Sequence, residues 1–402
     1  MLYEMKKFYK NSAVMILLVL AILLSIAMPI FFINSYESYD YSTGEEIVIT
    51  GLDGMKDRKE KIQKLSGVLS VDKLNDALEL YKSVPGRETA YFEIENKYPG
   101  FFYYLREAYS PFIESSGFQI RNIPNANNFY DRNIEKVEER IDSYGNNYLS
   151  NAEKQEVLKR VSDIKKPFTF EFIDQWPILI KSLFFSYFAI VFSAIIISNQ
   201  LFSFEKEENM DIILNTAGRK KLISIGFKKV LALLIYLTLE FLICSIIVSS
   251  IVFGLLGVSG WNVQIQMLPQ FFTIIYDLSI GQMYIYYMLI AWICILCVAL
   301  IGAFINSISQ KTYTSLIIST LLIVAPMFLK NSEYLSVNIQ KILYLQPVNG
   351  ANLFSFIDSL FSYNLCVSRV LTSTAMIIFA ITCSIICMSL CPFIFAQRIN
   401  RS

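Results

Sequence analysis

Six long apolar stretches constrain what this chain of 402 residues can fold into. A helix needs roughly 20 mostly apolar residues to cross a bilayer core about 30 Å thick. Backbone groups in that core must be paired within the segment, which favours helices. The stretches are residues 13–33, 178–202, 230–256, 284–306, 313–329 and 367–396. We therefore predict an all-α membrane protein with six transmembrane helices.

Basic residues in the short connections indicate the orientation, because lysine and arginine resist translocation and mark the cytoplasmic side. One side of the predicted membrane carries only Lys330 and Lys341 in its short connections. The other side carries Lys6, Lys7, Lys10, Lys206, Arg219, Lys220, Lys221, Lys228, Lys229, Lys311, Arg398 and Arg401. We expect a multi-pass protein of the cell membrane with both termini in the cytoplasm, and the even number of spans agrees because it requires the termini to share a side.

The first stretch has an alternative interpretation as a cleaved signal peptide. Three lysines precede it, and Ser25-Ile26-Ala27 resembles a cleavage site. Its apolar run exceeds the roughly 7 to 15 residues of a signal peptide's apolar region, so we predict an uncleaved helix. Residues 1–33 then form the cytoplasmic N-terminus and the first span.

The polar segment 34–177 is too long for a loop and has its own apolar periodicity, which predicts a mostly helical extracytoplasmic domain between the first and second spans. Ser150 and Glu153 have the spacing of a capping box. Two β-like pieces, 47–50 and 168–172, are expected to pair. Helices are expected at 55–65, 72–84, 101–114, 129–144 and 151–164.

The charge of this domain permits two interpretations. Residues 34–175 contain 25 acidic and 19 basic side chains, an excess of acid that would attract a cationic peptide at low salt. An ordinary solubilising surface has a similar composition. We expect the domain to act in cargo release or partner contact and to be unnecessary for assembly of the spans.

Several kinds of chemistry are excluded by composition. The chain has no histidine, so it has no histidine-based metal site and no Ser-His or Cys-His pair. It also lacks a phosphate-binding loop and cannot hydrolyse ATP by itself. Cys294 and Cys297 have the spacing of a redox or metal motif, but we interpret all seven cysteines as packing residues of apolar helices. We therefore predict no catalytic, cofactor-binding or metal-binding residues, and a net charge of +1 gives no reason to expect nucleic acid.

The connection 203–229 is the most informative segment. Acidic residues open it and basic residues close it, an order that suits a short helix because of the helix dipole. Gly218 is placed to end that helix with a left-handed cap. The segment otherwise has the composition of a solvated charge run beside the membrane, which is common. A second amphipathic stretch, 219–229, leads into the third span.

This loop and the plan of the spans resemble the permease subunits of type 2 ABC exporters. In that family the loop is a coupling helix that docks in a groove of a separate ATP-hydrolysing subunit. The glycine common after the acidic opening is replaced here, around Asn209 and Met210. The resemblance implies a contact with the ATPase through Glu205, Glu208, Asp211, Leu214 and Arg219. Segment 337–362, which has two amphipathic pieces, resembles the paired outer interfacial helices of the same family.

These observations favour a permease that exports an amphipathic substrate, such as a peptide, an antimicrobial peptide or a lipid-like molecule. The resemblance implies a dimer, with a second copy or a homologous permease, above two ATPase subunits. A membrane-anchored receptor or scaffold that senses a ligand through the extracytoplasmic domain is the alternative. A membrane enzyme acting on lipid-linked substrates is weaker, because no pair of carboxylates or nucleophile and base converges in the spans.

One ionisable residue stands out within the spans. Glu240 lies near the middle of the third stretch, where an ionised carboxylate is expensive. We expect it to face the bundle or a water-filled path, to stay protonated, or to pair with a polar group of another helix. The last of these is a purely structural role, since polar contacts between membrane helices are routine.

Overall fold

The computed structural model describes residues 2–41, 46–112, 118–145, 148–207, 210, 214, 216, 218–268, 270–332, 334–365 and 368–399. Two compact units are present. The first, the bundle unit, comprises Met1–Met28, Lys181–Val248 and Tyr286–Ser402. The second, the domain unit, comprises Pro29–Ile180 and Ser249–Ile285.

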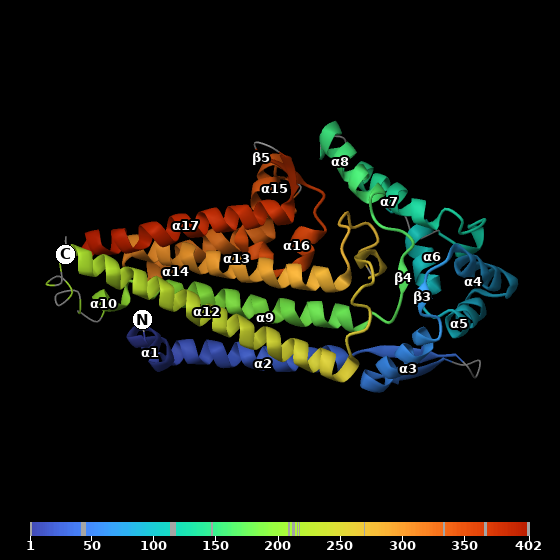
Figure 1. The fold of residues 1–402 in the computed structure, drawn as a ribbon, viewed down its shortest axis with the longest axis horizontal. Coiled ribbons are helices and arrows are strands. Elements are labelled where there is room, and N and C mark those ends of the chain that lie inside the picture. Colours follow the sequence, from blue (N-terminus) through green and yellow to red (C-terminus); the bar gives the residue numbers. More distant parts are fainter. Residues whose placement is uncertain are drawn as a thin grey trace. The chain divides into compact units, whose positions relative to one another are not determined.

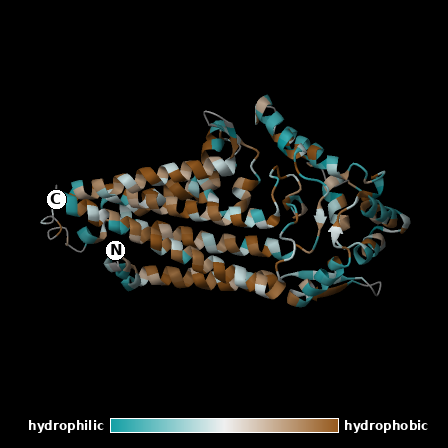
Figure 2. Cartoon of the chain, in the orientation of Figure 1, coloured by the Kyte–Doolittle hydropathy of each residue, from teal (hydrophilic) through white to brown (hydrophobic). Residues whose placement is uncertain are grey.

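The protein is an all-α membrane protein. Six helices of the described chain are long and apolar enough to cross a membrane, and they are the apolar elements of the fold (Figure 2). They are α2 (Ser12–Asn34), α9 (Gln175–Ser198), α12 (Arg219–Leu256), α13 (Ile280–Ser309), α14 (Thr312–Leu329) and α17 (Thr372–Ile399). All six correspond to predicted stretches, which confirms the predicted number of spans.

Most predicted boundaries differ from the observed ones by a few residues, and three of the differences follow from neighbouring structure. Helix α9 ends at Ser198 rather than at residue 202, where the backbone N–H groups of Phe202 and Ser203 bond to the Asn306 side chain of α13 instead of continuing the helix. Helix α12 begins at Arg219, so the amphipathic stretch before the third span is continuous with it. Helix α17 begins at Thr372 rather than at residue 367, because strands β5 (Ser362–Leu365) and β6 (Ser368–Leu371) form an antiparallel pair before it.

Helix α9 is the centre of the bundle unit, in which the long helices lie side by side (Figure 1). Its hydroxyl and amide side chains bond to three neighbouring helices. Ser186 accepts a hydrogen bond of 3.0 Å from Ser25 of α2, and Tyr187 shares one of 3.0 Å with Ser245 of α12. The Asn199 amide, just beyond α9, donates to Ser319 of α14 at 2.6 Å. Such contacts supply the association that hydrophobicity cannot supply within lipid.

The segment between α14 and α17 contains the two short helices that the sequence predicts. These are α15 (Val337–Tyr344) and α16 (Leu353–Ile357), with a 3-10 turn, Pro347–Ala351, between them. The Tyr287 hydroxyl of α13 donates to the carbonyl of Ala351 at 2.7 Å, which fixes this turn against the bundle. Their location at an outer membrane surface stays a prediction.

The polar helices of the domain unit largely match the predicted ones. They are α3 (Gly51–Gln63), α4 (Val71–Ser83), α5 (Arg87–Lys97), α6 (Phe101–Tyr109), α7 (Phe129–Ser143) and α8 (Asn151–Ser162). The capping box of Ser150 and Glu153 is confirmed at the start of α8. Helix α5 was not predicted, and α6 ends earlier than expected because Pro111 follows its C-cap. The predicted end of α6, at residue 114, lies outside the described residues.

The predicted pairing of strands 47–50 and 168–172 is wrong. Strand β2 (Ile47–Thr50) instead pairs with β1 (Glu37–Asp40), and β4 (Thr169–Phe170) pairs with β3 (Gly67–Val68). A hairpin between β1 and β2 closes a shorter loop, so it loses less chain entropy than the pairing of two distant segments.

A second chain segment completes the domain unit. Residues 257–279, between α12 and α13, contribute buried apolar side chains to its core, including Ile265, Met267 and Phe272. The Tyr104 hydroxyl of α6 donates a hydrogen bond of 3.2 Å to the Met267 carbonyl, and the Asn133 side-chain amide of α7 donates one to the Phe272 carbonyl. The domain is therefore built from the predicted segment 34–177 together with this later loop.

One glycine makes the close approach of this loop possible. Gly260 has φ +74°, and a Cβ atom there would lie 2.5 Å from the Ile173 side chain. Its backbone N–H donates to Glu171 at 2.9 Å. Any larger residue would be strained at this φ and would push the loop away from the start of α9.

Candidate functional site

A short N-terminal helix, α1 (Leu2–Lys10), packs on the side of α12. The rings of Phe8 and Tyr9 lie 5.5 and 6.1 Å from that of Tyr236. The side chain of Asn11 accepts from the Ala13 N–H at 3.0 Å, which caps the start of α2. Helix α1 therefore turns back against the bundle, at the end of the unit where α10 (Phe204–Glu207) also lies (Figure 1).

Four charged side chains from three elements meet here and form what we call the ion network: Glu4, Lys7, Glu205 and Lys229. Glu205, on α10, accepts hydrogen bonds from Lys7 of α1 at 3.0 Å and from Lys229 of α12. Glu4 lies 3.1 Å from the Lys7 Nζ and 3.7 Å from that of Lys229. Two acids thus face two bases, and the four charges balance.

Burial makes the ion network electrostatically strong. Glu205 is 3% exposed and Lys229 is 2% exposed. Burial favours the neutral form of Glu205, but the nearby ammonium groups of Lys229 and Lys7 outweigh it and hold the pKa of Glu205 below its usual 4.5. Burial by itself would lower the pKa of Lys7. The negative charge of Glu205 outweighs burial, so the pKa of Lys7 is raised above its usual 10.5. Glu205 and Lys7 therefore remain ionised at neutral pH.

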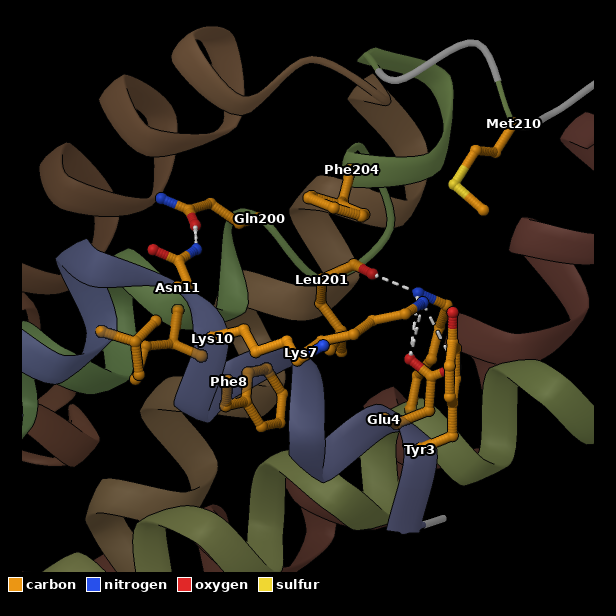
Figure 3. Close-up of a pocket in the computed structure, with 13 residues that line it drawn as sticks. Tyr3, Glu4, Lys7, Phe8, Lys10, Asn11, Gln200, Leu201, Phe204 and Met210 are labelled. Carbon is orange, nitrogen blue, oxygen red and sulfur yellow. Dashed lines mark hydrogen bonds and ion pairs between the residues drawn. The ribbon is translucent and has the colours of Figure 1, made fainter.

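The ion network borders a pocket of about 370 Å³ that is lined by α1, the end of α9, the following turn and α12 (Figure 3). Its walls are largely apolar and include Phe8, Val14, Ile197 and Phe204. Lys229 also donates to the Leu201 carbonyl at 2.9 Å, so α12 is tied directly to the turn after α9.

Asn306 of α13 holds the same turn from its other side. Its amide oxygen accepts from the N–H groups of Phe202 and Ser203 at 2.7 and 3.1 Å. Its NH₂ group donates to the Asn199 carbonyl at 2.5 Å and to the Ser315 hydroxyl of α14 at 3.0 Å. The start of the 203–229 loop is therefore fixed to α13 and α14 as well as to α1 and α12.

Of the residues predicted to contact an ATPase, the structure describes Glu205, Leu214 and Arg219, and these three differ in their surroundings. Glu205 lies inside the ion network, so its own surface is not available to a partner. Arg219 is exposed at the first turn of α12, and Leu214 is half-buried. Glu208 and Asp211 lie outside the described residues, as does most of the helix predicted between 205 and 218. Gly218 has φ +47°, the left-handed conformation expected for it, immediately before α12.

Glu240 is 1% exposed on α12, as expected for a carboxylate that faces the bundle. Its Oε1 accepts a hydrogen bond of 3.0 Å from the Ser193 hydroxyl of α9. Its Oε2 is buried without a hydrogen-bond partner among the described residues, and so is the Tyr236 hydroxyl one turn away. The polar contact with another helix is therefore present, and one carboxylate oxygen is left over.

Sequence reasoning missed most of the ion network and of its support. Lys7 and Lys229 entered the prediction only as charges that mark the cytoplasmic side, and Glu4 and Asn306 were not singled out. A polar residue at the end of an apolar stretch, such as Asn306, is the signal that could have drawn attention to this end of the bundle.

Comparisons with protein-family models, with curated proteins and with solved structures give no match to this chain. The geometry of the bundle unit and the chemistry of its residues therefore carry the functional argument.

Proposed function

We propose that this chain is the permease subunit of an ATP-binding-cassette exporter. The ion network is the observation that carries the proposal, because it joins the first residues of the 203–229 loop to α1 and to α12. A loop that receives force from a partner needs a stiff connection to the membrane helices. A solvated charge run would need no buried carboxylate between two lysines.

The ion network would transmit motion because it is costly to pull apart. Removing one partner of a buried ion pair destabilises a protein by about 3–5 kcal/mol. A push on α10 would therefore move Glu205, Lys7 and Lys229 together. Residues 219–229 of α12 add about 16 Å of helix before the predicted third span, which lets a displacement at Arg219 act as a lever on that span.

Both termini and the 203–229 loop would lie in the cytoplasm of a cell with this protein in its plasma membrane, and the inserted domain would lie outside. An ATP-hydrolysing subunit would dock on the loop through the surface around Leu214 and Arg219. A second permease copy or a homologous permease would complete the pathway for a peptide or lipid-like substrate.

Co-purification tests this proposal. The tagged chain is extracted from its native membranes in a mild detergent, and the eluate is assayed for a co-purifying ABC ATPase and for vanadate-sensitive ATP hydrolysis. The variant L214D/R219E should lose the ATPase while remaining in the membrane at normal levels. Lys311→Glu is the matched control, since Lys311 is an exposed base in the other short connection on that side.

Two outcomes would contradict the proposal. If no ATPase accompanies the wild-type chain, the membrane-anchored receptor becomes the better interpretation. If an ATPase binds equally well to L214D/R219E and to wild type, the docking surface lies elsewhere.

A further inference from the structure

The domain unit contains a basic pocket that is separate from the ion network. Three arginines, Arg87, Arg106 and Arg121, line a hollow of about 340 Å³. They come from the start of α5, the face of α6 and the short 3-10 turn Ile120–Asn122. The other lining residues are Tyr81, Phe102, Phe118, Gln119 and Ile120. No acidic residue is among the described residues that line this arginine pocket.

One of the three arginines is held rigidly. Arg121 donates to the carbonyls of Val84 and Gly86, the latter at 2.7 Å. Its guanidinium also lies over the ring of Tyr81, 5.6 Å from the ring centre. This side chain therefore connects the end of α4 to the start of α5 and presents a fixed positive charge beside the hollow.

The other two arginines are exposed and available. Among the described residues, Arg58, Arg132 and Arg160 each form an ion pair with a glutamate, whereas no ion pair of Arg87 or Arg106 is seen. Three like charges around one hollow repel each other unless a counter-ion is present. The surrounding segment has the opposite charge bias, with 25 acidic against 19 basic side chains in residues 34–175, so the cluster does not follow from composition.

The arginine pocket also has apolar lining residues, which include Phe102 and Ile120. Phe102 stacks edge-on against Tyr91 with ring centres 4.9 Å apart, and it lies 5.4 Å from the ring of Tyr81. Ile120 is 4% exposed. An anion with an attached apolar group would thus meet both guanidinium groups and apolar side chains in the same pocket.

We propose that the arginine pocket binds the phosphate group of an amphipathic molecule. A phosphate monoester carries about 1.5 to 2 negative charges and three acceptor oxygens at neutral pH, which matches three guanidinium groups better than a single carboxylate does. Guanidinium forks bind phosphate oxygens in pairs. The apolar part of the ligand packs on Phe102 and Ile120. This site does not depend on the export function proposed above.

Calorimetry on the full-length chain in detergent tests the site, because the core of the domain unit includes residues 257–279 and the isolated segment 34–177 would lack them. Phenyl phosphate, which joins a phosphate to a ring, should bind with a one-site isotherm that weakens with added salt. Benzoate should bind at least tenfold more weakly. A phosphate group of this kind belongs either to a soluble ester or to a lipid headgroup, and monomeric dihexanoyl phosphatidic acid separates these two sources. Binding of both phosphate probes indicates that the pocket accepts soluble esters, and binding of the lipid alone indicates that it accepts headgroups.

The variant R87Q/R106Q should weaken the binding of the phosphate probe by about tenfold or more, because it removes two charge-assisted contacts. Arg160→Gln is the matched control, since this arginine pairs with Glu156 on α8 and does not line the pocket. The single variants R87Q and R106Q give the same information if the double variant does not fold. The proposal is overturned by absence of saturable binding to both phosphate probes, by equal weakening in R160Q, or by benzoate binding as tightly as phenyl phosphate.

Discussion

Replacement of Glu205 by alanine should damage the ion network more than replacement of Lys229. Without Glu205, Lys7 and the fully buried Lys229 share only Glu4, which lies 3.7 Å from the Lys229 Nζ. An uncompensated buried charge of this kind costs about 3–5 kcal/mol. In Lys229→Met, Glu205 keeps its hydrogen bond of 3.0 Å from Lys7, so we expect a loss of about 1–3 kcal/mol.

The double variant E205L/K229M should recover most of the stability, because it removes both charges and fills the space with apolar atoms. With Glu205→Leu as the matching single variant, the interaction energy in the double-mutant cycle should be at least about 3 kcal/mol, because the two single losses add to about 4–8 kcal/mol and the double variant should lose much less. Lys228→Met is the matched control, since Lys228 is the exposed neighbour of Lys229 and its loss should change nothing measurable.

A thiol-reactive fluorophore gives the readout in detergent, because Cys244, Cys294 and Cys297 are fully buried in the folded chain and become reactive on unfolding. The melting temperature should be lowest for E205A, intermediate for K229M, and close to wild type for the double variant and for K228M. An equal loss for E205A and K228M would refute the reasoning, as would a double variant less stable than either single variant.

The pH dependence of the same measurement follows from the lowered pKa of Glu205. A carboxyl group whose pKa is lower in the folded state stabilises the fold above its unfolded pKa, and that contribution is lost as the pH falls. The difference between wild type and E205A should therefore be constant between about pH 6 and pH 9 and shrink below the ordinary value of 4.5. A difference that grows on acidification would contradict the assignment.

Three further predictions concern other parts of the chain. Glu240→Gln should keep the hydrogen bond from Ser193, and a normal export rate in this variant would show that the charge has no role. Glu240→Leu should lower both stability and transport. Normal export by Glu240→Leu would exclude even the polar role. Burial lowers the pKa of Lys330 to about 8, so the folded chain binds fewer protons than the unfolded chain between about pH 8 and pH 10.5. Below pH 8, Lys330→Met should therefore raise the melting temperature by the equivalent of about 3 kcal/mol. This gain should vanish above pH 10.5. Replacement of residues 35–174 by a flexible linker should still permit insertion of the spans. It should expose apolar side chains of the 257–279 loop, such as Phe272, and so cause aggregation, which size-exclusion chromatography measures. Shortening that loop as well should prevent the aggregation.

The spans were predictable because length and apolar content alone decide whether a helix can cross a bilayer. Their ends were less predictable, since the end of α9 depends on Asn306, which lies about a hundred residues further along the chain. The capping box at Ser150 was predictable for the opposite reason, because both of its partners lie within one helical turn.

The candidate site was predictable only in part. The charge pattern of the 203–229 loop singled out Glu205, but a sequence does not show that Lys7 and Lys229 enclose this carboxylate from two other helices. The lysines were interpreted as residues typical of one membrane side, and that interpretation hid their role in the ion network. Pairings between distant segments, such as β3 with β4, were missed because they depend on the tertiary fold.

The two-segment construction of the domain unit sets an order of events during synthesis. Tyr104 and Asn133 reach their partners only after residues 257–279 have been made, and α9 and α12 lie between these two parts of the chain. At about 5–20 residues per second, a ribosome adds the intervening residues in roughly 4 to 16 seconds. During this interval the first segment holds an unfinished apolar core that must avoid non-native contacts. The domain can therefore finish folding only after the second and third membrane helices have been made. This order couples the folding of the polar part of the protein to the synthesis of its membrane helices.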